Sequence, residues 1–298
     1  MRRLGVLLAL CSGCVRHVPA PSNDGFVELV RAEVTTPKPL ERATMPEASK
    51  LHFLFIAGFL SEGIPGYFKD NADVVTDELG ASASMFFPPS GGNLETDAEL
   101  IRAEVSRLTD ELQRPVVLIG HSKGGAGAVL TVLRNPELVR SGRVVHVVSI
   151  QGALRGSPLA DGIVKSLPIP LLHDAFRGPT TLTREKAEAS FRAAPPSTAM
   201  IDWYQRHVRY VRSSETTGQA SQELALTHAF VATHGSGRND GLLLEEDQWL
   251  PGIGHDLGVL RGDHAAFTVS SPLSNGTAET RKAFTRALLK QVFVVERE

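Results

Sequence analysis

The chain has 298 residues, of which 42% are hydrophobic and 21% charged, and its formal net charge is −2. This composition is that of an ordinary globular protein, and the length allows one large domain with a full core or two small domains. No long basic stretch accompanies the near-neutral charge, so the sequence does not predict nucleic-acid binding, which needs a concentrated positive surface.

The first twenty residues have the pattern of a targeting segment. Arg2 and Arg3 precede an apolar run at residues 4–10, and small residues then lead to Cys14. A basic start, a short apolar run and small residues before a cleavage point are typical of a secretory signal. Residues 4–10 are also too few to span a bilayer, which takes about 20 residues.

Residues 11–14, Cys-Ser-Gly-Cys, resemble the lipobox of bacterial lipoproteins, in which the last cysteine is lipidated after cleavage. Cys11 departs from that pattern because leucine is usual at its position. The resemblance implies a signal peptide over 1–13, a lipid anchor at Cys14 and export to the bacterial cell envelope. Val15 at the following position, instead of Asp, resembles sorting to the outer membrane. The alternative is ordinary export without a lipid.

Residues 14–50 are rich in proline, threonine, serine and charge. We interpret them as a tether followed by an irregular N-terminal extension. Cys11 and Cys14 are the only cysteines of the chain. Cleavage before Cys14 would therefore leave no internal disulfide, and stability would have to come from a packed core.

From residue 51 onward, short apolar runs and amphipathic stretches alternate. The steps of three and four between the apolar residues of 94–112 are typical of a helix that packs on one face. Strands are predicted at 51–57, 83–87, 116–119 and 144–150, with helices at 66–79, 94–112 and 124–133 between them. This order predicts the α/β class, with a mostly parallel central sheet and helices on both faces.

Residues 157–224 interrupt the alternation, because prolines separate shorter amphipathic pieces. We interpret this stretch as a cap inserted into a single domain that spans 51–298. Within it, 167–176 has two interpretations, a lid or a buried part of the cap. The sheet is expected to resume with a strand at 224–233, and a closing helix is expected at 277–292.

Residues 120–124, Gly-His-Ser-Lys-Gly, match G-x-S-x-G, the nucleophile elbow of α/β-hydrolases. In that motif a serine sits on a sharp turn between a strand and a helix, and side chains at the two glycine positions would collide across the turn. So short a pattern also arises by chance as a turn of small residues. Here a predicted strand precedes it and a predicted helix follows, so we interpret Ser122 as a nucleophile and expect His121 to pack beside it.

A serine hydroxyl is a poor nucleophile unless a histidine takes its proton and a carboxylate orients that histidine. In α/β-hydrolases the acid and then the histidine follow the serine along the chain. Asp240, in the turn sequence Asn-Asp-Gly, and His264 have this order, which predicts the triad Ser122, Asp240 and His264. The competing interpretations are a turn former for Asp240 and a surface histidine for His264. His255 is a rival base, although its glycine-rich surroundings indicate a loop.

Acyl transfer also needs hydrogen-bond donors directed at the developing oxyanion. One donor is expected to be the backbone N–H of Lys123, which follows the nucleophile. The other is expected from the loop after the first core strand, where Phe59 is preferred and Leu60 is the alternative.

These motifs make the stretch from 51 to 161 similar to bacterial triacylglycerol lipases of the true-lipase family. The C-terminal Asn239–Leu242 and Asp263-His264 fall where that family places its acid and base, so the resemblance covers about two thirds of the chain. It implies the α/β-hydrolase fold and an ester or lipid substrate, and the predicted triad chemistry calls for no metal or organic cofactor. The further matches are Gly58 after a buried strand, Gly66-Tyr67-Phe68, Leu118–Ser122, and Arg155-Gly156-Ser157 with Ala160-Asp161.

Two positions depart from the family pattern. Ala57 stands where the family usually has a histidine before the oxyanion glycine, which puts the fine oxyanion geometry in question. Ala266 stands two residues after the predicted base, where the family commonly has an aspartate of a structural calcium site. We therefore expect that calcium site to be missing.

The sequence thus predicts a carboxylic ester hydrolase, of lipase or esterase type, that acts through a Ser122 acyl-enzyme. One alternative is the cleavage of a polyester or of a phospholipid acyl chain. Another is a binding lipoprotein without catalysis on a hydrolase scaffold, because a fold does not determine a function.

Overall fold

A computed structural model of the chain describes residues 24–166, 180–270 and 274–294. Within these ranges the strands form one six-stranded sheet with the order β2-β1-β3-β4-β5-β6, and every neighbouring pair runs parallel. The predicted α/β class and parallel central sheet are therefore confirmed. The strands are β1 (His52–Ile56), β2 (Ser82–Phe86), β3 (Val116–His121), β4 (Val144–Ile150), β5 (Val208–Ser214) and β6 (His255–Arg261).

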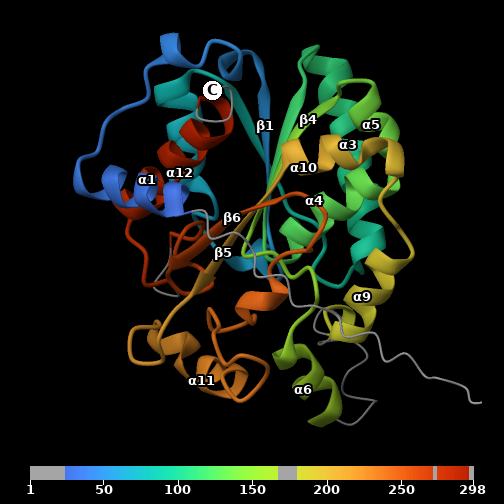
Figure 1. The fold of residues 1–298 in the computed structure, drawn as a ribbon, viewed down its shortest axis with the longest axis vertical. Helices are drawn as coiled ribbons and strands as arrows, with labels where there is room; N and C mark the ends of the chain where they lie inside the picture. The colour runs from blue at the N-terminus through green and yellow to red at the C-terminus, as the bar shows by residue number, and fades with distance from the viewer. Residues whose placement is uncertain (1–23, 167–179, 271–273, 295–298) are drawn as a thin grey trace, which may run out of the picture.

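Helices cover both faces of the sheet (Figure 1). One face carries α1 (Asp24–Thr35), α2 (Lys69–Asp73), a π-helical turn (Val74–Leu79) and α12 (Ala278–Phe293). The other carries α3 (Leu94–Leu112), α4 (Lys123–Arg134), α5 (Pro136–Arg140) and α10 (Ile201–His207). Toward the lower end of the view lie α6 (Pro158–Ser166), α9 (Arg184–Arg192) and α11 (Gln222–Val231). Short 3-10 turns lie at Arg42–Thr44, Ala48–Lys50, Ser61–Gly63, Thr198–Met200 and Glu245–Asp247.

Two apolar clusters sandwich the sheet. Along β3, Val117 and Ile119 belong to the cluster beneath α1 and α12, whereas Val116 and Leu118 belong to the cluster beneath α3 and α4. Alternate residues of a strand point to opposite faces, so a strand covered on both sides must be apolar throughout. This explains why the central strands read as continuous apolar runs. No helix in the described ranges has the length and apolar character needed to cross a bilayer.

The strand order changes direction between β1 and β3. From β1 the chain moves outward to β2, and it then returns to the other side of β1 to form β3. At such a switch point the loops that leave neighbouring strands diverge to opposite faces and leave room for a ligand. The loop after β1 and the turn at Ser122 both lie at this switch point.

The N-terminal extension contains a helix that the sequence interpretation missed. α1 spans Asp24–Thr35, and Phe26 and Val30, one turn apart on it, are buried against the sheet. The Phe26 ring meets the Phe284 ring of α12 edge-on at 6.2 Å between centroids. The expected irregular structure is therefore wrong for this segment, because the prolines at 19, 21, 37 and 39 flank the helix and do not interrupt it.

The expected strand at 224–233 is also wrong. These residues lie mainly in the helix α11, and the sheet resumes earlier with β5, inside the range interpreted as a cap. A short apolar run does not distinguish a strand from a helix, and in α11 Leu226 is 84% exposed while Val231 is buried. The lid candidate 167–176 lies outside the described residues.

Truncation of Phe26 tests whether α1 belongs to the core. Phe26→Ala removes a fully buried ring and is expected to lower the free energy of unfolding by about 3–5 kcal/mol. Val34→Ala, on the same helix but at a side chain that is 50% exposed, should change it by about 0.5 kcal/mol or less. Urea unfolding measures both, and equal effects would contradict the packing of α1.

Candidate active site

Ser122 occupies the strained turn that the motif predicts. It joins β3 to α4 with φ 55° and ψ −124°, a conformation that non-glycine residues adopt only where their surroundings impose it. A Cβ atom on Gly120 would lie 2.4 Å from the carbonyl oxygen of Gly124. A Cβ on Gly124 would lie 2.4 Å from the carbonyl oxygens of Ile56 and Ala57 in and after β1. Both glycines are therefore required by the close approach of three backbone segments.

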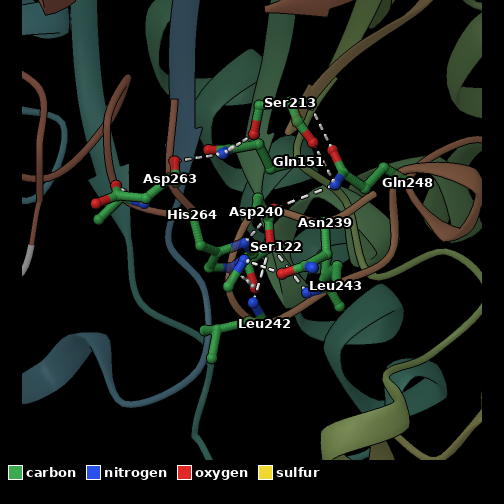
Figure 2. A network of polar contacts seen from close by, with 12 residues as sticks. Ser122, Gln151, Ser213, Asn239, Asp240, Leu242, Leu243, Gln248, Asp263 and His264 are labelled. Atoms are coloured by element: carbon green, nitrogen blue, oxygen red, sulfur yellow. Dashed lines mark hydrogen bonds and ion pairs between the residues drawn. The ribbon is translucent and has the colours of Figure 1, made fainter. Parts of the chain in front are cut away.

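The structure brings the three predicted residues of the triad together (Figure 2). His264 Nε2 lies 2.8 Å from Ser122 Oγ, and His264 Nδ1 lies 2.7 Å from Asp240 Oδ2. His264 follows β6, and Asp240 lies in the loop between α11 and the turn at 245–247. Asp240 is fully buried, while Ser122 is 8% and His264 5% exposed. The hydroxyl, the imidazole and the carboxylate thus form one hydrogen-bonded series.

Asp240 is held by the turn that contains it. Its Oδ1 accepts hydrogen bonds from the N–H groups of Leu242 and Leu243, at 3.0 and 2.9 Å. Its Oδ2 accepts one from the side chain of Gln248 at 3.2 Å, and its main-chain carbonyl accepts the N–H of His264 at 2.7 Å. Such donors stabilise the charged carboxylate and fix its direction. Asp240 is therefore a turn residue and, at the same time, the hydrogen-bond partner of His264.

Two buried glutamines support the acid and the histidine, and the sequence interpretation found neither. Gln248 accepts the N–H of Ser213 at 2.7 Å and donates to the Ser213 carbonyl at 2.9 Å, which ties it to the end of β5. Gln151, directly after β4, donates to the Ser213 hydroxyl and, at 2.8 Å, to the carbonyl of Asp263. Figure 2 shows both amides beside the Asp240–His264 pair. Only the position of Gln151 at a strand end was visible in the sequence.

Asp263, which precedes the predicted base, organises a loop, and the rival base His255 lies away from that loop. Asp263 is buried, and its carboxylate accepts N–H groups of Ala265, Asn275 and Ser221 at 3.1, 2.9 and 3.2 Å, so it organises the loop beside His264. The rival base His255 is the first residue of β6. It therefore lies at the amino edge of the sheet, at the other end of the strand from the His264 loop.

The loop after β1 passes against Ser122. A Cβ on Gly58 would lie 2.9 Å from the Cβ of Ser122. The N–H of Leu60 is engaged, because it donates to Ser90 Oγ at 2.8 Å, which favours Phe59 of the two predicted oxyanion donors in this loop. Lys123 is the first residue of α4, and the amides of a first helical turn have no partner within the helix.

The Lys123 side chain makes a buried ion pair that the sequence did not indicate. Its Nζ lies 2.8 Å from Asp97 Oδ2 on α3 and donates to the carbonyl of Pro89 at 3.1 Å, and both charged side chains are buried. The loop at 89–90 thus contacts Lys123 and, through Ser90, Leu60. Partners so far apart in the chain leave no local signal in the sequence.

Metal ligands do not gather in the part of the chain that the structure describes. Within these ranges, no three or more histidine, cysteine, aspartate or glutamate side chains form a group that could hold an ion. Ala266, at the expected calcium-ligand position, is packed in the apolar cluster beneath α12. The absence of the family's calcium site stays a prediction.

Solved structures with a similar fold include one named as a carboxyl esterase and one named as a lipase. The metagenomic carboxyl esterase MGS0156 has a TM-score of 0.66 and 20% identity, over 82% of this chain and 76% of that one. The lipase BlEst2 of Bacillus licheniformis in its mature form has a TM-score of 0.60 and 15% identity, over 83% and 93%. No protein-family model matches the chain, and no curated protein matches it by sequence. At these identities the likeness establishes the fold, and the chain has the α/β-hydrolase fold.

One buried histidine and one half-buried histidine make stability depend on pH. Burial, with the nearby His264, lowers the pKa of His121 well below its usual value of 6.5. Burial, with Arg209 and Arg206, lowers the pKa of His207 to about 4. The unfolded chain takes up these protons near pH 6.5 and the folded chain does not, so stability falls as the pH drops below 6.5.

We expect urea unfolding to show a lower free energy of unfolding at pH 5 than at pH 7. In His207→Gln this loss should be smaller by about 1 kcal/mol, after allowance for the partial exposure of that ring. An unchanged loss in the variant would mean that His207 is protonated in the folded protein.

Proposed function

We propose that this protein is a serine hydrolase that cleaves carboxylic esters, of lipase or esterase type, through an acyl-enzyme on Ser122. The observation that carries the proposal is the hydrogen-bonded series from Asp240 through His264 to Ser122, placed at a strained turn on an α/β-hydrolase sheet. The similarity in fold to a carboxyl esterase and a lipase supports it.

In this mechanism His264 Nε2 accepts the Ser122 proton as Oγ attacks the ester carbonyl carbon. Asp240 stabilises the imidazolium that forms and keeps its Nε2 directed at the reacting atoms. The oxyanion of the tetrahedral intermediate accepts hydrogen bonds from the N–H groups of Phe59 and Lys123. The imidazolium then returns its proton to the leaving alcohol, and Ser122 is left acylated.

Deacylation repeats these steps with water. His264 takes a proton from the water, whose oxygen attacks the acyl carbon. The second tetrahedral intermediate then collapses with cleavage of the bond between the acyl carbon and Oγ, the His264 imidazolium returns its proton to Oγ, and the acid is released. In this scheme His264 carries out every proton transfer, and the reaction uses no cofactor.

Removal of the Ser122 hydroxyl tests this function. Ser122→Ala keeps the Cβ atom, and hence the backbone strain of the turn, but should lower the hydrolysis of p-nitrophenyl esters by about 10⁴-fold or more. Ser141→Ala, at an exposed serine after α5, is the matched control and should keep full activity. A wild-type protein without turnover on any acyl length would favour a non-catalytic binding scaffold.

We also propose that Cys14 carries a lipid and that the protein is anchored in the bacterial cell envelope, with the outer membrane favoured by Val15. The signal-like residues 1–13 support this proposal, and they lie outside the described ranges. The lipid would place the hydrolase domain beside a membrane that contains ester-linked lipids.

Exchange of each cysteine separates lipidation from plain export. In full-length protein made in a bacterial host, Cys14→Ser should move the protein from the membrane to the soluble fraction and remove the lipid mass. Cys11→Ser makes the same sulfur-to-oxygen exchange three residues earlier, and this variant should keep both the membrane association and the lipid mass. Fractionation and intact-mass spectrometry measure this, and a lipid retained by the Cys14 variant would contradict the assignment.

A further inference from the structure

A chain of hydrogen bonds runs behind the nucleophile and joins the two loops that flank it. The N–H of Gly58, after β1, donates to the Tyr67 hydroxyl oxygen at 3.0 Å. That oxygen lies 2.5 Å from His121 Nδ1, and His121 Nε2 lies 2.7 Å from the carbonyl oxygen of His264. The chain therefore links the expected oxyanion loop, the residue before the nucleophile and the loop of the expected base.

The positions of the protons follow from the two ends of this chain. The Gly58 amide can only donate and the His264 carbonyl can only accept. Tyr67 therefore accepts from Gly58 and gives its own proton to His121 Nδ1. His121 must then carry its proton on Nε2, which donates to His264 and faces the Gln151 side-chain oxygen at 3.2 Å.

The burial of the two middle residues favours this arrangement. Burial raises the pKa of the Tyr67 phenol, and it lowers the pKa of His121, so the phenol stays protonated and the imidazole stays neutral. Both side chains are almost fully buried, at 4% and 2% exposure. A hydrogen bond shielded from water in this way is hard to replace once one partner is removed.

Gly58 needs such a restraint. Glycine has the widest conformational freedom of all residues, and the side chain before it, Ala57, is too short to hold it. The segment is closely confined, because a Cβ at Gly58 would lie 2.9 Å both from Ser122 Cβ and from the Tyr67 hydroxyl oxygen. The planar peptide that joins Gly58 to Phe59 then sets the direction of the Phe59 N–H.

We infer that Tyr67 is a positioning residue, which holds Gly58 through its hydroxyl so that the Phe59 N–H points at the oxyanion, and which couples this loop through His121 to the His264 loop. The inference rests on the proposed ester hydrolysis. An oxyanion hole stabilises the transition state because its donors are held in place before the reaction, so a loosened donor lowers kcat more than it alters substrate binding.

Tyr67→Phe removes the hydroxyl and keeps the ring. We expect kcat for p-nitrophenyl esters to fall about 10- to 100-fold, below the loss for complete removal of an oxyanion donor, with KM changed by about threefold or less. Inhibition by an alkylboronic acid, whose tetrahedral adduct imitates the oxyanion, should weaken in parallel. The pH profile of kcat/KM should keep its midpoint, because His264 and Asp240 keep their contacts.

Tyr204→Phe is the matched control. Tyr204 is also fully buried, and its hydroxyl donates to the Val132 carbonyl at 3.3 Å, in the core beneath α4 and α10. This variant loses a buried hydroxyl of the same kind and should keep kcat, KM and boronate inhibition. Equal losses of kcat in the two variants, or a kcat in Tyr67→Phe within about twofold of wild type, would overturn the inference.

Hydrogen exchange tests the same restraint without catalysis. The amides of 58 and 59 should exchange faster in Tyr67→Phe than in the wild-type protein or in Tyr204→Phe. Unchanged exchange would overturn the positioning role. If the wild-type protein shows no turnover, the proposed hydrolysis fails, and the exchange experiment still decides whether Tyr67 holds Gly58.

Discussion

The positive φ of Ser122 is the constraint on which the rest of the site depends. A serine keeps this conformation only if its neighbours leave no alternative, and the surrounding backbone meets that condition. The N–H of Ser122 donates to the carbonyl oxygen of Ile150 at the end of β4, and the carbonyl oxygen of Ser122 accepts the N–H groups of Ala126 and Ala153. Glycines at 120 and 124 let β1 and α4 approach within the space that a side chain would fill. The sheet thus places the Ser122 hydroxyl at the carboxyl end of β3, where His264 contacts it.

The residues around Ser122 come from loops that share no secondary structure, so polar contacts must align them. Gln151 and Gln248 tie the base and acid loops to the end of β5, and Tyr67 with His121 ties the base loop to the loop after β1. Nearly all these groups are buried, where a polar group without a partner would be costly. The same contacts that satisfy buried polar atoms therefore also hold the geometry that the proposed acyl transfer needs. The arrangement explains how a site assembled from loops can be well ordered.

The sequence predicted those parts of the site that depend on local chemistry. Ser122 was recognisable because two glycines and a strand-to-helix change surround it, and Asp240 because its turn and its order before His264 fit the acyl-transfer scheme. The contacts of Tyr67 and of the Lys123 side chain join residues far apart in the chain, so no local pattern reveals them. The strand β5 was not predicted, because Arg209 and Arg212 interrupt the continuous apolar run that is expected of a strand inside a parallel sheet. Arg212 is tolerated there because Asp256 and Glu245 neutralise it at 2.5 and 3.0 Å.

The central claim is that Ser122 becomes acylated, and trapping of that intermediate tests it most directly. Wild-type protein would be mixed with a p-nitrophenyl ester, quenched in acid within milliseconds and digested for mass spectrometry. The account predicts one added acyl group, located on the peptide that contains Ser122, formed at the rate of the p-nitrophenol burst. Ester turnover with no acylated peptide, or with the acyl group on a different residue, would contradict it.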